Sequence, residues 1–174
     1  RILLVQPRPA SNWYKKEVNQ NKIQELRDDL NISDEDIVLF SIARHIERKG
    51  IHRIIETLHS NHRLKEMSNL KYLIAGKGPF TSIYKELIRK YSLEDKVIVL
   101  GIIPEEDKIH FYDLCDIFLL PTLTTNSGDI EGYGLIFLEA MGRKKPVISG
   151  DTGGVSEAVG NGDYGILLHH DYSN

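Results

Sequence analysis

Apolar runs of strand length alternate with helical patterns along most of this chain, and this alternation restricts the fold more than any other feature. Five runs lie at residues 37–43, 72–75, 97–100, 117–120 and 147–149, with a weaker sixth at 164–168. Helical patterns occupy residues 21–31, 51–59, 81–91, 105–115, 135–142 and 156–159. Strands without polar alternation are buried on both faces, and their alternation with helices implies right-handed βαβ units. The sequence therefore predicts an α/β fold, a doubly wound parallel sheet (Rossmann-like) of about six strands with helices on both faces.

The length of 174 residues suits one domain that buries its own core. Residues 1–20 contain Pro7 and Pro9, which disfavour a helix, so we expect an extended segment and linker there. Residues 21–174 are expected to form one Rossmann-like domain. Because the sequence starts at Arg1 and ends in a polar stretch, we expect it to be a piece of a longer protein.

Composition excludes several classes of function. The chain has 22 basic and 25 acidic residues and a formal charge of -3, so nucleic acid is not an expected partner. Cys115 is the single cysteine, which excludes an internal disulfide and indicates a reducing, cytoplasmic compartment. Its apolar neighbours favour a buried, inert thiol. No apolar run is long enough to span a bilayer, so any association with the inner face of a membrane would be peripheral.

Glycines and polar residues gather where the expected strands end. They occupy residues 44–50, 76–79, 101–104, 121–131 and 150–154. Ligands of open parallel sheets bind outside the carboxyl ends of the strands. The sequence therefore places the candidate site at this edge.

Residues 127–140 are the most informative of these segments. A glycine-rich loop containing Gly132 and Gly134 leads into an apolar run of helix formers, and the unpaired N–H groups at the start of such a helix suit a phosphate. Glu131 and Glu139 bracket the start, and eight positions of about 100° each leave them about 80° apart around the helix axis. Two carboxylates beside a phosphate suit the hydroxyl groups of a sugar nucleotide. The alternative is a loop that only caps a core helix.

A basic turn follows the first expected strand. It carries Arg44, Arg48 and Lys49 and closes with Gly50 before a helix. Arginine and lysine bind phosphate oxygens through charge-assisted hydrogen bonds. The sequence favours a phosphate site over a solvated turn, because the turn faces a second anion site at Gly134.

Four motifs in order carry a family resemblance: residues 41–50 (SIARHIERKG), 75–79 (AGKGP), 131–139 (EGYGLIFLE) and 151–157 (DTGGVSE). Together they resemble the C-terminal half of a retaining glycosyltransferase of the family 4 (group 1) type, over residues 37–168. That family has two Rossmann-like domains facing across a cleft (the GT-B fold), and the C-terminal domain holds the nucleotide-sugar donor. Two positions depart from its pattern. Ser156 replaces a common proline, which leaves the role of Glu157 open, and Ala43 replaces the usual glycine.

The resemblance implies a set of contacts with the donor. Arg44 and Lys49 would contact the phosphates, as would the amides of Leu135 and Ile136. The backbone at Ile103 would meet the base.

The two carboxylates are given different partners by the resemblance. Glu131 would bind hydroxyls of the transferred sugar and Glu139 would bind the ribose. Glu131, Arg44 and Lys49 are thus the expected catalytic group, and Arg48 and Gly134 complete the expected donor site.

The resemblance implies the donor-binding half of an enzyme that transfers a sugar, with retention, from a nucleotide diphosphate sugar to a glycan or lipid-linked acceptor. This half alone is expected to bind a nucleoside diphosphate without transferring sugar. The alternatives are a sugar-nucleotide epimerase of the same fold and a nucleotide-binding module without transferase activity.

No cofactor and no metal are expected in the site. Residues 34–36 spell the Asp-x-Asp pattern of metal-dependent glycosyltransferases, but they precede the first strand, at the wrong end of the sheet. Residues 76–79 lack the complete fingerprint of a nicotinamide-dependent dehydrogenase.

Overall fold

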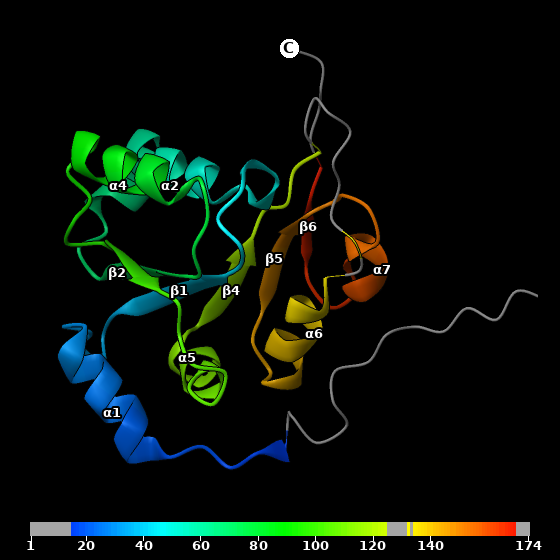
Figure 1. Ribbon diagram of the computed structural model, residues 1–174, viewed down its shortest axis with the longest axis horizontal. Helices are drawn as coiled ribbons and strands as arrows, with labels where there is room; N and C mark the ends of the chain where they lie inside the picture. The colour runs from blue at the N-terminus through cyan, green and yellow to red at the C-terminus, as the bar shows by residue number, and fades with distance from the viewer. Residues whose placement is uncertain (1–14, 125–131, 133, 170–174) are drawn as a thin grey trace, which may run out of the picture.

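A computed structural model of the chain describes residues 15–124, 132 and 134–169. Within them, one parallel sheet has the strand order β3-β2-β1-β4-β5-β6 (Figure 1). Its strands are β1 (Ile37–Ile42), β2 (Leu70–Ala75), β3 (Val97–Gly101), β4 (Ile117–Leu120), β5 (Val147–Gly150) and β6 (Ile166–Leu168). The predicted six-stranded, doubly wound parallel sheet is confirmed.

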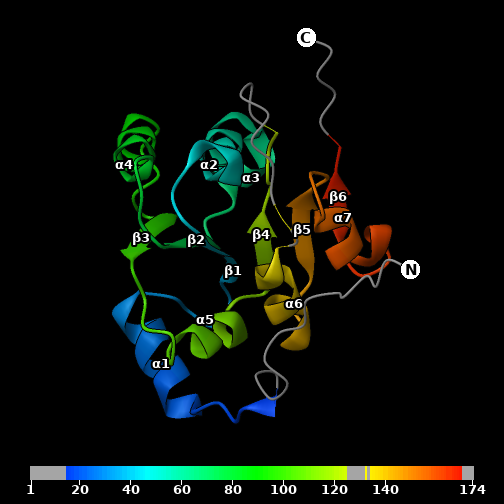
Figure 2. The same ribbon diagram turned by 45° about the vertical axis from the view of Figure 1, so that its right-hand side comes forward.

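Helices cover both faces of this sheet. The α-helices are α1 (Gln20–Asp29), α2 (Ile51–Ser60), α3 (His62–Glu66), α4 (Thr81–Lys90), α5 (Lys108–Leu114), α6 (Leu135–Gly142) and α7 (Val155–Ala158). The short 3-10 helices are η2 (Glu47–Lys49) and η3 (Gly160–Gly162). Figures 1 and 2 show α2 and α4 on one side of the sheet and α5 on the other, with α1 packed beside α5.

The start of α5 differs from the sequence prediction. The helix begins at Lys108 rather than at residue 105. The chain first forms a turn in which the Asp107 amide donates to the Pro104 carbonyl (3.1 Å). The helix formers at the start of this segment are therefore used in a turn.

Three short helices were not expected from the sequence, namely α3 and the 3-10 helices η2 and η3. Helix α3 has five residues, which is too short to show an apolar period. Its first turn is capped by the Asn61 side chain, which accepts from the Leu64 amide (3.2 Å). The 3-10 helix η2 lies in the basic turn, and η3 follows α7.

The core is densest around Phe40 on β1. Its ring stacks on Phe111 of α5 at 5.7 Å and meets the edges of Tyr112 and Phe118 at 5.6 and 6.1 Å. Phe118 in turn meets Phe137 of α6 at 5.8 Å, so one aromatic cluster joins the sheet to both helices.

Cys115 lies at the end of α5 and is buried, as the sequence predicted. Its Sγ donates to the Tyr112 carbonyl at 3.3 Å. Burial raises the pKa of the thiol to about 12, so the thiolate needed for reactivity is disfavoured.

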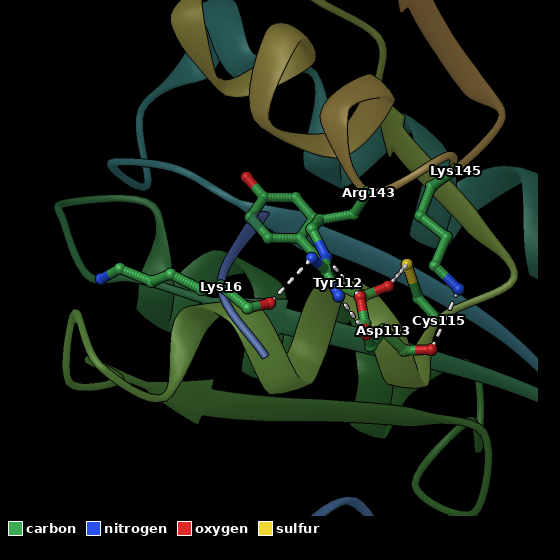
Figure 3. Close-up of polar contacts among 6 residues, drawn as sticks. All are labelled: Lys16, Tyr112, Asp113, Cys115, Arg143 and Lys145. Atoms are coloured by element: carbon green, nitrogen blue, oxygen red, sulfur yellow. Dashed lines mark hydrogen bonds and ion pairs between the residues drawn. The ribbon is translucent and has the colours of Figure 1, made fainter. Parts of the chain in front are cut away.

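A polar contact joins α5 to the residue after α6. Figure 3 shows the Arg143 guanidinium between the Asp113 carboxylate and the backbone of Lys16. Arg143 donates to both Asp113 oxygens (Nε 2.7 Å, Nη2 2.5 Å) and to the Lys16 carbonyl (3.2 Å). The hydrogen bonds to Asp113 raise the pKa of Arg143. This contact ties the segment before α1 to the helical layer.

The turn after β1 packs directly on the end of β4. Gly50 has a left-handed backbone (φ 68°), and a Cβ there would lie 2.0 Å from the Pro121 carbonyl oxygen. The Leu123 amide donates to the Arg48 carbonyl at 2.7 Å across the same contact. Only glycine satisfies both the backbone conformation and the close approach at this position.

We expect Gly50→Ala to lower the free energy of unfolding by more than the left-handed backbone conformation alone would cost, because the new Cβ would also clash with Pro121. The left-handed conformation alone costs a non-glycine residue about 1–2 kcal/mol. Gly101→Ala is the matched control, because Gly101 has φ 76° but a Cβ added there would have no atom within 4 Å. Urea unfolding of both variants measures the difference, and equal losses would show that the contact with Pro121 is not tight.

Candidate functional site

The strand order reverses between β1 and β4, which are neighbours in the sheet. Leu39 pairs with Ile117 and Phe40 with Phe118. From β1 the chain moves to β2 on one side, and from β4 to β5 on the other. A crevice at such a reversal is where doubly wound sheets bind ligands. The basic turn and the chain leading to α6 both start at this point.

The basic turn lies at the carboxyl end of β1. Arg44 is exposed, while Arg48 and Lys49 are partly buried within η2. The Lys49 amide donates to the Ile46 carbonyl at 3.1 Å, which closes the turn. Three cations are thereby held at the edge of the crevice, where a phosphate contact is chemically feasible.

His45 holds this turn from inside and was not assigned a role from the sequence. Its side chain is buried, with Nδ1 2.8 Å from Thr81 Oγ1 and Nε2 3.3 Å from the Ala75 carbonyl oxygen. Because a carbonyl can only accept, we infer that the proton resides on Nε2. Burial lowers the pKa of His45, and the hydrogen bond to Ala75 offsets this only in part. A lone histidine in a polar turn shows no pattern in sequence that predicts such burial.

Gly76 and Gly78 let the loop after β2 pack closely on the basic turn. A Cβ on Gly76 would lie 1.9 Å from the Ala43 carbonyl oxygen, and one on Gly78 would lie 2.3 Å from the His45 carbonyl oxygen. The His45 amide also donates to the Lys77 carbonyl at 3.0 Å. The glycines of this loop therefore let two backbones meet.

Helix α6 begins at Leu135, as predicted, directly after Gly134. Gly134 is left-handed (φ 70°), and a Cβ there would lie 2.6 Å from Phe137 Cδ2. The first N–H groups of the helix, including those of Leu135 and Ile136, have no acceptor within the helix. They form a potential anion site at the end of β4.

The loop before this helix carries the other expected carboxylate. Glu131 lies outside the described residues, as do residues 125–130 and 133. The expected pair of carboxylates is therefore described only at Glu139. Gly132 is described, and its carbonyl accepts from the Gly154 amide at 3.0 Å, which joins this loop to the one after β5.

Glu139 projects from the second turn of α6 toward α5. The Lys108 Nζ lies 3.2 Å from its Oε1 and 3.1 Å from its Oε2, and the Tyr112 hydroxyl donates to Oε2 at 3.0 Å. The Glu139 side chain keeps 18% of its surface exposed. It is therefore a partly accessible carboxylate, held from one side.

Lys108 was missed from the sequence, although its position offered a cue. It occupies the apolar stripe of α5 together with Phe111, Tyr112 and Cys115, at helical spacing. Burial lowers the pKa of Lys108, but its hydrogen bond with Glu105 and the charge of Glu139 raise it more, so the net shift is upward. The cation thus persists in the buried site.

The remaining expected contact is the backbone at Ile103. Ile103 is partly buried in the loop after β3, and the adjacent Ile102 is 63% exposed. This loop lies at the carboxyl edge of the sheet, two strands from β1.

No group of three or more His, Cys, Asp or Glu side chains in the described part of the chain could hold a metal ion. The Asp-x-Asp pattern precedes β1, and there Asp36 Oδ2 accepts from the Ser33 amide at 2.7 Å in a tight turn. That turn lies at the edge of the sheet opposite the crevice.

A family model described as "Glycosyl transferases group 1" matches residues 22–173. The chain belongs to the group 1 glycosyltransferases. The resemblance stated from the four sequence motifs is confirmed at this level.

Individual relatives agree with this family. The chain is 36% identical over 122 residues to the amylovoran biosynthesis glycosyltransferase AmsK of Erwinia amylovora, covering 70% of this chain and 29% of that protein. It is 30% identical over 128 residues to a GDP-mannose-dependent alpha-(1-6)-phosphatidylinositol monomannoside mannosyltransferase of Mycobacterium tuberculosis (strain H37Rv), covering 73% and 33%.

Among solved structures, Anabaena Alr3699/HepE in complex with UDP and glucose has the same fold. It superposes with a TM-score of 0.71 and 26% identity, covering 91% of this chain and 40% of that one. The chain therefore spans less than half the length of the relatives compared with it.

We expect His45→Gln to change how stability depends on pH. Because the pKa of His45 is lowered in the fold, its contribution is complete above the ordinary histidine pKa of about 6.5 and is lost as the pH falls toward the folded value. The stability difference between wild type and His45→Gln should therefore shrink from about pH 8 to about pH 5.5.

Chemical unfolding of both proteins across this range measures the difference. The other titrating groups are common to both, so their effects largely cancel. A difference that stays constant with pH would show that His45 does not titrate in this way.

Proposed function

We propose that this domain binds a nucleotide diphosphate sugar and serves as the donor-binding half of a retaining glycosyltransferase. The observation that supports the proposal is the crevice where β1 and β4 end side by side, in a chain that belongs to the group 1 family. The turn with three cations follows β1, and the chain after β4 leads to the N-terminus of α6. Both features favour a diphosphate.

The relatives support a nucleotide sugar and leave its base open. The mycobacterial relative is named for GDP-mannose, whereas the HepE structure contains UDP and glucose. AmsK is named for biosynthesis of a polysaccharide, amylovoran. We propose a glycan or lipid-linked acceptor on these grounds. Its site would lie in a further domain, for which the longer relatives have room.

The proposed chemistry is electrostatic. When the sugar leaves, negative charge grows on the diphosphate, and Arg44, Lys49 and the N-terminus of α6 would stabilise it. Arg48 and the amides of Leu135 and Ile136 would add contacts to the same group. Because these groups supply the positive charge, we propose that donor binding requires no metal ion.

We assign the two carboxylates to different hydroxyl groups. Glu139 would accept from the ribose and Glu131 from the transferred sugar. Retention of configuration, and the role of Glu131 in catalysis, follow from the family resemblance and are part of this proposal.

We place the protein in the cytoplasm, because that compartment keeps a free thiol such as Cys115 reduced. It would reach a membrane-bound acceptor by peripheral association with the membrane. No helix among the described residues is long and apolar enough to cross a membrane.

Replacing Arg44 or Lys49 with alanine should weaken binding of a nucleoside diphosphate by about 1.5–3 kcal/mol each. Loss of a charge-assisted hydrogen bond to phosphate is the reason. Calorimetric titration of the chain with UDP and GDP measures the effect. Arg53→Ala is the control, since Arg53 is exposed on α2 and pairs with Glu56 in the next turn.

The same variants should bind the unphosphorylated nucleoside as wild type does, and a chelator should leave diphosphate binding unchanged. Equal weakening of nucleoside and diphosphate would make the turn structural. Loss of binding in chelator would contradict the metal-free site.

Substitution of the two glutamates should affect binding of different ligands. Glu139→Gln should weaken the diphosphate and the sugar donor alike, because both carry the ribose. Glu131→Gln should weaken the intact donor and spare the bare diphosphate. Titrating both variants with UDP and UDP-glucose, or with GDP and GDP-mannose, tests this. If Glu131→Gln harmed the diphosphate as much as the donor, its contact with the sugar would be wrong.

The alternatives predict other products. An epimerase would interconvert two nucleotide sugars without an acceptor, which chromatography of the incubated donor would detect. A module that only binds nucleotide would support no turnover even in the presence of an acceptor domain.

A further inference from the structure

Lys108 is a buried cation whose position cannot be explained by packing alone. The residue is 7% exposed on the apolar stripe of α5, where an aliphatic side chain would pack without losing hydration. Most other ion pairs among the described residues are more exposed, such as Lys22–Glu25 at 39% and 63%. A charge kept in such a place is often tied to a specific polar partner.

That partner is Glu139 of the proposed site. The Lys108 ammonium lies 3.2 and 3.1 Å from the two carboxylate oxygens, so it straddles the group. The Tyr112 hydroxyl adds a donor to Oε2 at 3.0 Å. Both donors come from α5 and approach from one side. The Glu139 side chain is therefore fixed in direction before any ligand binds.

The hydrogen bonds leave capacity on the carboxylate. An ionised carboxylate has about four acceptor sites, two on each oxygen. The Lys108 ammonium contacts both oxygens and the Tyr112 hydroxyl donates to Oε2, so these three contacts use about three of the four sites. About one acceptor site remains, on Oε1, which suits one hydroxyl group of a ribose.

We propose that Lys108, assisted by Tyr112, is a positioning residue that presents Glu139 to a ribose hydroxyl group and so sets preference for ribonucleotides over deoxyribonucleotides. This rests on the proposed function, because it takes Glu139 as the ribose contact. Glu105, on the loop after β3, also pairs with the Lys108 ammonium at 2.8 Å, so the lysine is itself held in place.

The test compares ligands that differ by one hydroxyl group. The chain is titrated with UDP and 2′-deoxy-UDP, and with GDP and 2′-deoxy-GDP. The wild type should prefer the ribose form by about tenfold or more, as expected for a hydrogen bond to a charged group. Lys108→Met should bring this ratio close to one, as Glu139→Gln should, while affinity for the deoxy ligand changes little.

A double variant sharpens the test. If Lys108 acts through Glu139, Lys108→Met combined with Glu139→Gln should lower the ratio no further than Glu139→Gln alone. Tyr112→Phe removes one donor with little change in volume and should lower the ratio by a smaller factor. This variant keeps the proposal testable if Lys108→Met fails to fold.

Arg143→Met is the matched control. Arg143, directly after α6, forms another partly buried ion pair with Asp113 of α5, in which the two side chains are 14% and 19% exposed. Its loss should lower stability and leave the ribose preference unchanged.

The outcomes separate the two proposals. If the wild type binds no nucleoside diphosphate, the proposed function fails and this inference fails with it. If the wild type prefers ribose and Glu139→Gln removes that preference, but Lys108→Met and Tyr112→Phe both retain it, only the positioning role is overturned.

Discussion

The site depends on how closely the backbone segments leaving β1, β2 and β4 approach one another. Carbonyl oxygens of Ala43, His45 and Pro121 occupy the space where side chains on Gly76, Gly78 and Gly50 would lie. These contacts hold three strand exits together without intervening side chains. The cations of the basic turn are therefore placed on a rigid edge, which suits a site that must hold a diphosphate in one orientation.

Two partly buried ion pairs among the described residues fix the helical layer below this edge. Lys108 pairs with Glu139, and Asp113 pairs with Arg143. In both cases one residue lies on α5 and the other on α6 or just after it, so the pairs act at successive positions along the two helices. Desolvating such charges is costly, and the geometry repays it only when partners are well placed. The pair nearer the start of both helices is the one that contacts the proposed site.

The sequence correctly predicted the elements that have a clear local pattern, such as an apolar run or a glycine followed by helix formers. The bounds of β4 and α6 agree with the apolar run at residues 117–120 and with the change from glycines to helix formers at Leu135. Short elements were missed, namely helix α3, the 3-10 helix η2 in the basic turn and the 3-10 helix η3. The start of α5 was placed three residues too early, because helix formers at Glu105 and Glu106 are used in a turn after Pro104.

The sequence by itself determined the order of the strands and longer helices along the chain and the parallel sheet, because both depend on apolar period and chain connectivity. From these it predicted the edge at which we expect a ligand to bind. Tertiary structure alone decided that His45 is buried between two loops and that Lys108 meets Glu139. Both contacts join residues about 30 positions or more apart, so no local pattern encodes them. Burying a polar side chain costs free energy unless it gains a hydrogen-bonding partner. Which polar side chains are buried with a partner, and which stay in water, is therefore decided only when the helices pack on the sheet.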